Sequence, residues 1–454
     1  MSAGGTVMRE LAGFVAEGDV PESALHAARR TVANATCLVI GSAGAPAVDQ
    51  AAAMVDSLAT PPRSPILGRD QRASVPWAAF VMGVAAHLED FDDTHLRTII
   101  HPGAPVPPAA IALGSNLGRD TVAVAVAVAV GVEAMLRLGN AICPQHFERG
   151  WHLTATMGPV GVAATAARLL ELDAATTRHA MGLALVQAGG TQAVLGTMAK
   201  PFHPGRAALH GLEAANLAGQ GLTLPSNVLE EYAHAHSDTP DLSQVVVGLG
   251  SSWELESNAF KPYSCGIVAH PLIDGGIALR DRIPAAADIE SIEVQANPWV
   301  LVAMGLEDPQ HGLESKFSSY HAMAAGYLHG RAGPAEFSDE LARDPELVAL
   351  RRRIAITGDD RIPRDAAILA ATDRSGRLHE IRIDHATGSI ERPMTDDQLR
   401  EKGRGELERR LSAAAAADLL DLLFDPGARQ LDELTELATP LPRAAEGGSD
   451  GNGG

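Results

Sequence analysis

Segments rich in alanine and leucine, each long enough for a helix, follow one another through the first 280 residues of this chain. Alanine and leucine have the highest helix propensities, and about 12 such residues make three turns. This part of the chain is therefore expected to be mainly α. The expected helices are 23–38, 77–88, 106–116, 159–172, 176–187 and 207–218.

Valine and alanine alternate over residues 121–130, a period of two that is typical of a strand. An isolated strand among helices would have no partner, so we interpret this segment as a helix buried on all sides. The apolar run, residues 121–132, is bounded by Asp120 and Glu133. It is shorter than a bilayer span, which needs about 20 residues. We expect no membrane association.

The pattern changes near residue 285. Residues 289–295 alternate apolar and polar side chains, as a half-buried strand does, and three further segments resemble strands: 353–357, 366–372 and 378–384. A capping box at Thr395 and Gln398 then restarts helices that run through residue 424.

The chain of 454 residues exceeds the roughly 250–300 that one core supports, so two domains are expected. We expect a large all-helical domain built from both chain ends and a smaller inserted α+β domain. The expected boundaries are 1–270 and 401–442 for the helical domain, 271–400 for the α+β domain, and 443–454 for a disordered tail.

Net charge and cysteine usage limit the function. A charge of −20 and a pI near 5.2 disfavour nucleic acid and anionic membranes as partners, so an anion would need a local basic pocket. Cys37, Cys143 and Cys265 share no close spacing, which predicts a reduced, cytoplasmic protein without a zinc, disulfide or iron–sulfur framework. We expect no metal and no cofactor.

Lysine is rare here. Among 36 basic residues the lysines are Lys200, Lys261, Lys316 and Lys402, and arginine supplies the rest. A lysine in such a chain can mark a place that needs a compact ammonium group able to lose its proton. Chance codon usage explains any single lysine equally well.

Acidic and histidine residues cluster from His87 to His95, and His101 follows shortly after. The four carboxylates of this segment would repel one another if they were all buried. They face solvent, bind a cation, or act as acid–base groups with shifted pKa values, and the sequence leaves these alternatives open.

A histidine or lysine stands directly before proline five times. Proline disfavours the helical conformation in the residue before it, so these side chains are expected on rigid, extended loops that suit catalytic groups. The five residues are His101, Lys200, His203, Lys261 and His270.

Two further segments carry candidate residues. His152 is expected in a loop before a helix that begins near Pro159, where free N–H groups can receive an anion. Thr154 and Thr156 are equally well explained as ordinary helix caps. Tyr320 closes the segment 314–320, although a lone tyrosine on an alanine-rich helix usually belongs to a core.

Six motifs together resemble the MmgE/PrpD family, from about residue 8 to 425. They begin at Asp90, His101, Gly150, Lys200, Lys261 and Lys316, and read DFDDT, HPGA, GWHLTAT, KPFHPGR, KPYSC and KFSSY. The family includes 2-methylcitrate dehydratase, cis-aconitate decarboxylase and iminodisuccinate epimerase.

The resemblance implies a homodimer with an active site between the two domains. The residues implied to be catalytic are Asp90, His101, His152, Lys200, Lys261 and Tyr320. The resemblance also implies that Thr94 lines the site, and we expect Thr94, His203, Arg206 and His270 to bind substrate.

We therefore expect a cofactor-independent lyase acting on a small di- or tricarboxylic acid. Dehydration is the main hypothesis for its reaction, and decarboxylation and epimerisation are the alternatives. His101 or His152 would exchange the proton at carbon, and the two pre-proline lysines would bind carboxylates. Asp90 would orient a histidine, and Tyr320 would protonate the leaving oxygen.

Two departures from the family pattern bear on the substrate. Cys265 is followed by Gly266 where the tricarboxylate dehydratases show arginine, and the distance from Thr94 to His101 is about one residue longer than in the decarboxylases.

Two other classes of function remain as alternatives. Asp90, Asp92 and Asp93 could hold Mg²⁺ for isoprenoid diphosphate chemistry, but that class needs an aromatic pocket, and aromatic residues make up only 4% of the chain. A non-enzymatic helical interaction protein would leave the histidine–proline and lysine–proline pairs unexplained.

Overall fold

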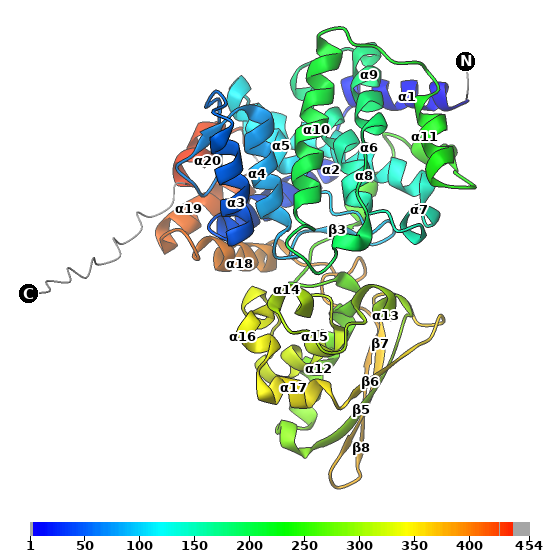
Figure 1. Cartoon of the computed structure of the whole chain (residues 1–454), viewed down its shortest axis with the longest axis vertical. Helices are drawn as coiled ribbons and strands as arrows, with labels where there is room; N and C mark the ends of the chain where they lie inside the picture. The colour runs from blue at the N-terminus through cyan, green and yellow to red at the C-terminus, as the bar shows by residue number, and fades with distance from the viewer. Residues whose placement is uncertain (1–2, 426, 439–454) are drawn as a thin grey trace, which may run out of the picture.

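The computed structural model describes residues 3–425 and 427–438, which form two bodies (Figure 1). The larger body is helical and contains both ends of the described chain. The smaller body comes from the middle of the chain and carries a sheet. This arrangement confirms the mainly α fold with an inserted α+β domain. The predicted disordered tail, 443–454, lies outside the described residues.

The helical domain is built from two stretches of chain. The first contains α1 (Ala3–Glu17), α2 (Glu22–Ser42), α3 (Pro46–Ser57), α4 (Val75–His87), α5 (Val106–Leu117), α6 (Thr121–Ile142), α7 (Gln145–Glu148), α8 (Leu153–Leu169), α9 (Ala174–Val186), α10 (Phe202–Gly219) and α11 (Val228–His236). The second contains α18 (Asp396–Leu407), α19 (Ala413–Phe424) and α20 (Leu431–Leu437). Two short antiparallel pairs accompany them: β1 (Ser64–Pro65) with β2 (Arg72–Ala73), and β3 (Thr94–His95) with β4 (Asn258–Ala259).

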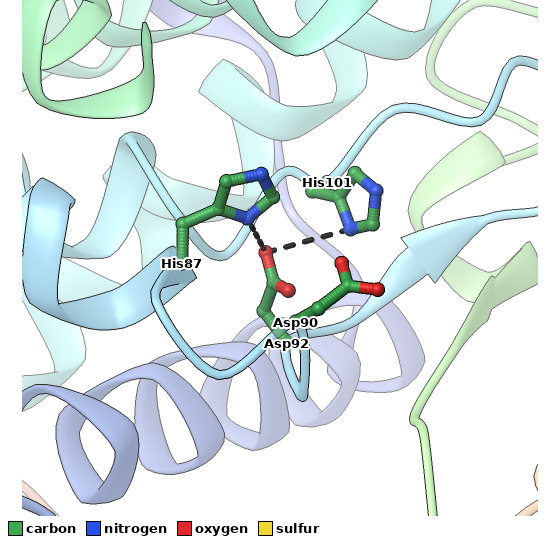
Figure 2. Close-up of side chains that lie close together, drawn as sticks. All are labelled: His87, Asp90, Asp92 and His101. Carbon is green, nitrogen blue, oxygen red and sulfur yellow. Dashed lines mark hydrogen bonds and ion pairs between the residues drawn. The ribbon is translucent and has the colours of Figure 1, made fainter. Parts of the chain in front are cut away.

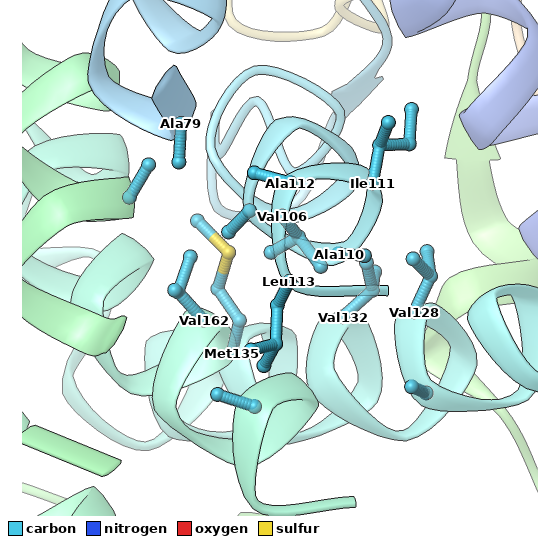
Figure 3. Close-up of a cluster of buried hydrophobic side chains, with 14 of the residues drawn as sticks. Ala79, Val106, Ala110, Ile111, Ala112, Leu113, Val128, Val132, Met135 and Val162 are labelled. Atoms are coloured by element: carbon cyan, nitrogen blue, oxygen red, sulfur yellow. The ribbon is translucent and has the colours of Figure 1, made fainter. Parts of the chain in front are cut away.

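Helix α6 lies in the core of this domain, so the segment with strand-like alternation is indeed a helix. Small residues let it approach its neighbours: a Cβ on Gly131 would lie 2.6 Å from the carbonyl oxygen of Gly161 on α8. Figure 3 shows α4, α5, α6 and α8 meeting around Ile111, Val132 and Met135. Alanine, valine and glycine at these positions follow from such close packing, because larger side chains would not fit.

Helix α6 is also longer than the apolar run in the sequence suggested. Its 22 residues are long and apolar enough for a bilayer span by length and composition. About 83% of its most apolar window is buried within the protein, which is typical of a core helix.

Helix α8 begins earlier than predicted. Its first residue is Leu153, and His152 is the N-cap residue, with φ −91° and ψ 104°. Pro159 therefore lies inside the helix and not at its start. The prediction placed too much weight on proline as a helix start, because a buried helix can tolerate one proline where packing compensates for the lost hydrogen bond.

The small domain is a four-stranded sheet covered by helices. Its elements are α12 (His270–Arg282), β5 (Ile289–Ala296), α13 (Trp299–Met304), α14 (Gly312–Ser315), α15 (Ser319–His329), α16 (Asp339–Ala342), α17 (Pro345–Arg351), β6 (Ile354–Gly358), β7 (Ala367–Asp373) and β8 (Leu378–Ile383). The strand order is β6-β5-β7-β8, with β5 and β6 parallel and the other pairs antiparallel.

The alternation in β5 has the predicted consequence. Ile289, Ile292 and Val294 are buried, whereas Glu290 and Glu293 face solvent. The buried face packs against α12 and α15, which lie on one side of the sheet (Figure 1).

The chain returns to the helical domain at α18, which packs against α2. The predicted capping box is present, since Thr395 and Gln398 bond each other's backbone N–H groups. The domain boundary predicted at residue 400 falls inside α18. The boundary is therefore earlier than expected, because α18 belongs to the helical domain from its first turn.

Candidate active site

A cavity lies between the two domains. Six of the residues proposed from the sequence line it: Asp90, Thr94, His101, His152, Lys200 and Lys261. They come from loops and helix starts as far apart as 171 residues in the chain. The fold thus brings the predicted acid–base and cationic groups together.

Asp90 is paired with both cavity lysines. Lys200 Nζ donates to Asp90 Oδ1 at 2.5 Å, and Lys261 Nζ lies 3.1 Å from the same oxygen. Burial alone would raise the pKa of Asp90, but the two ammonium groups hold it below its usual value. Burial lowers the pKa of Lys200, and Asp90 offsets part of that shift. Asp90 therefore orients the two lysines, whereas the sequence had suggested that it orients a histidine.

Asp92 takes the role that was predicted for Asp90. Its Oδ2 lies 2.6 Å from Nδ1 of His87 and 3.5 Å from Nδ1 of His101, so the carboxylate sits between the two imidazoles (Figure 2). All three side chains are buried. Burial lowers the pKa of His87 to about 4 and also lowers that of His101, although Asp92 opposes both shifts. Burial therefore favours the neutral form of both imidazoles.

His152 and His203 form a second imidazole pair. Their Nδ1 atoms lie 2.9 Å apart, so one ring donates to the other. Burial, followed by the charges of neighbours such as Lys200, holds the pKa of His152 well below its usual value. His203 does not line the cavity itself, but its contact with Nδ1 helps to fix the ring of His152, which does line the cavity.

The other predicted residues lie outside the cavity lining. Tyr320 sits on α15 within the hydrophobic core of the small domain. Arg206 lies on α10, where its guanidinium is 2.6 Å from Nε2 of His210. His270 is buried at the start of α12 with its ring against Tyr263. The alternative interpretation of Tyr320, as a core residue on an alanine-rich helix, therefore agrees with its position.

The pre-proline pattern is only partly a loop signal. His101, Lys200 and Lys261 do lie on loops, but His203 and His270 belong to the first turns of α10 and α12. Proline has no backbone N–H, but the N–H groups in the first turn of a helix have no partner within the helix, so proline is tolerated there. A helix can therefore begin at the residue before a proline. The pattern therefore marks helix starts as well as loops.

Much of the cavity wall is apolar. Phe147 and Leu195 come from the helical domain, and Val268, Trp299 and Met304 come from the small domain. An apolar wall opposite charged groups orients a ligand that has carboxylates at one end. It also strengthens every electrostatic interaction inside the cavity by excluding water.

Three important residues were not among the predicted site residues. Asp92 lay within the acidic cluster, but nothing in its spacing separated it from Asp90. Lys316 and Lys402 were noted as rare lysines, and both contact the loop that carries Asp90. The rarity of lysine was the signal that could have identified them.

The cluster in Figure 2 could in principle offer ligand atoms to a metal. One atom each from His87, Asp90, Asp92 and His101 lie within 4.8 Å of one another. However, the ammonium groups of Lys200 and Lys261 already bind the Asp90 carboxylate, and a cation would be repelled by them. With these two lysines present, the site fits an anion better than Mg²⁺.

Charge balance suggests what the cavity can do. Asp90 forms ion pairs with Lys200 and Lys261, and Asp92 lies between His87 and His101. An anionic ligand entering this pocket would favour protonation of an imidazole. The site can therefore bind carboxylates and move a proton to or from carbon.

Comparisons with known proteins agree with this picture. The MmgE/PrpD N-terminal domain model matches residues 9–237, and the MmgE/PrpD C-terminal domain model matches residues 263–424. The chain is 28% identical to the cis-aconitate decarboxylase of Mus musculus, over 79% of this chain and 78% of that protein. It is 28% identical to the Homo sapiens cis-aconitate decarboxylase, over 82% and 80%, and 26% identical to that of Aspergillus terreus, over 94% and 92%.

Proposed function

Because this chain belongs to the MmgE/PrpD family, we propose that it is a lyase that uses its own side chains for acid–base chemistry on a small polycarboxylic acid. We further propose decarboxylation of an unsaturated tricarboxylate, with cis-aconitate as the first substrate to test. The observation that carries the proposal is the convergence of Lys200, Lys261, His101 and His152 on one largely apolar cavity.

The lysines would hold two carboxylates of the substrate. Asp90 keeps both ammonium groups in place, so that little rearrangement is needed when the anion arrives. The third carboxylate would then lie toward the apolar wall formed by residues such as Val268 and Met304. An apolar wall stabilises a localised carboxylate charge less than the dispersed charge of a decarboxylation transition state.

The reaction needs one proton at carbon. When the C–C bond to the leaving carboxylate breaks, its electron pair forms a new C=C bond and CO₂ departs. The electrons of the original C=C bond shift to the carbon beside a remaining carboxylate, where the lysines stabilise the enolate-like charge. That carbon takes a proton from His152 or His101, either of which gains the proton when the anion binds.

Dehydration is the second candidate, because burial lowers the pKa of His101 and of His152 and so favours the neutral imidazole, which is a base. A dehydratase would remove a proton from carbon and also protonate a leaving hydroxide. Tyr320, the acid first suggested for the second step, lies in the core of the small domain. This position favours decarboxylation over dehydration.

A panel of acids tests the proposal. The purified protein would be incubated separately with cis-aconitate, 2-methylcitrate and iminodisuccinate, and products and CO₂ would be followed by NMR and gas analysis. We expect CO₂ release from cis-aconitate, and loss of water from 2-methylcitrate would instead favour the dehydratase. A panel without any turnover would contradict both.

Variants connect the activity to the cavity. His152→Ala is expected to reduce turnover by about 10²–10⁴-fold, the usual contribution of one acid–base group. His234, an exposed residue of α11, provides the matched control His234→Ala, which should keep wild-type turnover. Equal activity in the two variants would remove His152 from the mechanism.

A further inference from the structure

Three consecutive backbone carbonyls accept hydrogen bonds from three different lysines. Lys316 Nζ donates to the carbonyl oxygen of Glu89 at 2.9 Å. Lys261 Nζ donates to that of Asp90 at 3.0 Å, and Lys402 Nζ donates to that of Phe91 at 2.6 Å. We call Lys261, Lys316 and Lys402 the lysine clamp. Together with Lys200 on the Asp90 side chain, every lysine of the chain contacts residues 89–91.

The backbone here has a conformation that needs support. Asp90 has a φ of +49°, in the left-handed region, which costs roughly 1–2 kcal/mol for a residue other than glycine. Residues 89–91 lie beyond Leu88, the C-cap residue of α4, so no continuing helix supplies N–H groups to their carbonyl oxygens. Buried carbonyls without partners are expensive, and ammonium donors satisfy them strongly.

The lysine clamp joins separate parts of the fold. Lys316 follows α14 in the small domain, and its ammonium also lies 3.1 Å from Oε2 of Glu89 and 2.7 Å from Oγ of Ser264. Lys402 lies on α18 in the returning part of the helical domain, and it also donates to the carbonyl oxygen of Lys261 at 2.9 Å. The loop of Asp90 and the loop of Lys261 are thus bound to the same ammonium.

Burial of Lys316 and Lys402 is unfavourable, because it removes their ammonium groups from water. Lys316 is only 3% exposed. Burial lowers the pKa of Lys402 to about 7, although Glu406, Asp92 and Asp93 oppose the shift. Neither residue lines the cavity. A role in holding other groups explains their position better than contact with substrate.

We propose that Lys316 and Lys402 are positioning residues, which hold the Asp90 turn so that its carboxylate keeps Lys200 and Lys261 aligned in the cavity. Their effect on turnover rests on the proposed function. Their effect on the geometry of the cavity lysines does not, and it can be measured without substrate.

The small number of lysines makes a direct test possible. Protein labelled with ¹³C and ¹⁵N in lysine gives one set of side-chain NMR signals for each of four residues. Single substitutions assign the signals. In Lys402→Met and in Lys316→Met, we expect the Nζ and Cε signals of Lys200 and Lys261 to shift, and kcat per folded molecule to fall by about tenfold or more with a smaller change in KM.

A matched control separates positioning from general stability. Leu229 is a buried core residue of α11, so Leu229→Ala should lower the melting temperature but leave the signals of the cavity lysines unchanged. Lys402→Arg keeps a positive donor and should return the signals and kcat toward wild type. If Lys402→Met does not fold, Lys402→Arg and Lys316→Met carry the same comparison.

The outcomes distinguish the two proposals. Unchanged signals and unchanged kcat in folded Lys402→Met and Lys316→Met would overturn the positioning role, even if the wild type decarboxylates cis-aconitate. Shifted signals in a protein that turns over no acid of the panel would support the positioning role and contradict the proposed function.

Discussion

Lys200 Nζ lies 2.5 Å from Oδ1 of Asp90, although 110 residues separate the two along the chain. Lys261 Nζ approaches the same oxygen at 3.1 Å from the loop that follows β4. One carboxylate therefore holds two ammonium groups that point into a cavity. This arrangement supports the proposal that the cavity binds an anion, in a chain whose net charge is −20.

Replacing Lys200 by methionine is expected to abolish most activity while retaining the fold. Asp90 keeps Lys261 as a partner, so the loss of one charged hydrogen bond should cost about 1.5–3 kcal/mol of unfolding free energy. kcat/KM should fall at least 10³-fold, since one carboxylate anchor is lost. Chemical denaturation and steady-state kinetics measure the two effects.

The double variant Asp90→Asn with Lys200→Met serves as the control. It also removes the carboxylate that Lys261 still binds in Lys200→Met, and the Lys261 side chain is fully buried, so the double variant should be less stable than Lys200→Met and equally inactive. Recovery of activity in the double variant would show that Lys200 serves only to neutralise Asp90.

Much of the fold was predictable because it depends on local pattern. Alanine-rich segments became helices, and the alternation of residues 289–295 became β5. The start of α8 was missed because Pro159 is a local signal that tertiary packing overrides. Local patterns identify elements well and their ends less well.

The site was predictable only where a residue carried its own signal. Lys200 and Lys261 stood out as rare lysines before proline, and both line the cavity. The sequence could not show that Asp90 binds the lysines and Asp92 the histidines, because neighbouring carboxylates of this kind differ only in the direction of their side chains. Lys402 acts from a distance of 311 residues, a separation that no local pattern records.

The pH dependence of catalysis should report a histidine that must gain a proton. Burial holds the pKa of His152 well below its usual value, so the protonated form becomes scarcer as the pH rises. If that form donates the proton to carbon, kcat/KM falls with increasing pH between 6 and 8, approaching tenfold per unit. Loss of the Lys200 proton, whose pKa is also lowered, acts in the same direction.

Two observations would contradict this reading. A kcat/KM that is flat from pH 6 to 8 indicates a neutral base, as in dehydration. The second is a lack of proton uptake on binding of the anion at pH 7.5, where uptake is expected. Calorimetry in buffers of different ionisation enthalpy measures it.

Asp92→Asn should separate orientation from charge at the imidazoles. The carboxylate lies 2.6 Å from Nδ1 of His87 and 3.5 Å from Nδ1 of His101, and an amide of the same size cannot favour the same tautomers. We expect a fall in kcat of about 10²–10⁴-fold, as for other buried carboxylates that orient a catalytic histidine. Kinetics with a folded variant, verified by circular dichroism, measure the effect, and wild-type kcat would argue against this orienting role.

Gly103→Ala tests the packing of the loop after His101. The Gly103 N–H donates to Asp93 Oδ1 at 2.9 Å, and a Cβ at this position would collide with the same carboxylate. Overpacking of this kind costs about 1–3 kcal/mol of unfolding free energy. Gly405→Ala on α18, where nothing lies within 4 Å of the added Cβ, is the matched control and should be neutral or stabilising. Equal melting temperatures for the two variants would show that the loop yields freely.

Turnover of cis-aconitate in D₂O, followed by NMR, tests the central claim most directly. We expect release of CO₂ and a product that carries one deuteron, at the carbon that received the proton, and we expect the reaction to be lost in Lys261→Met. Recovery of cis-aconitate without CO₂ release, or undiminished turnover by folded Lys261→Met, would contradict it.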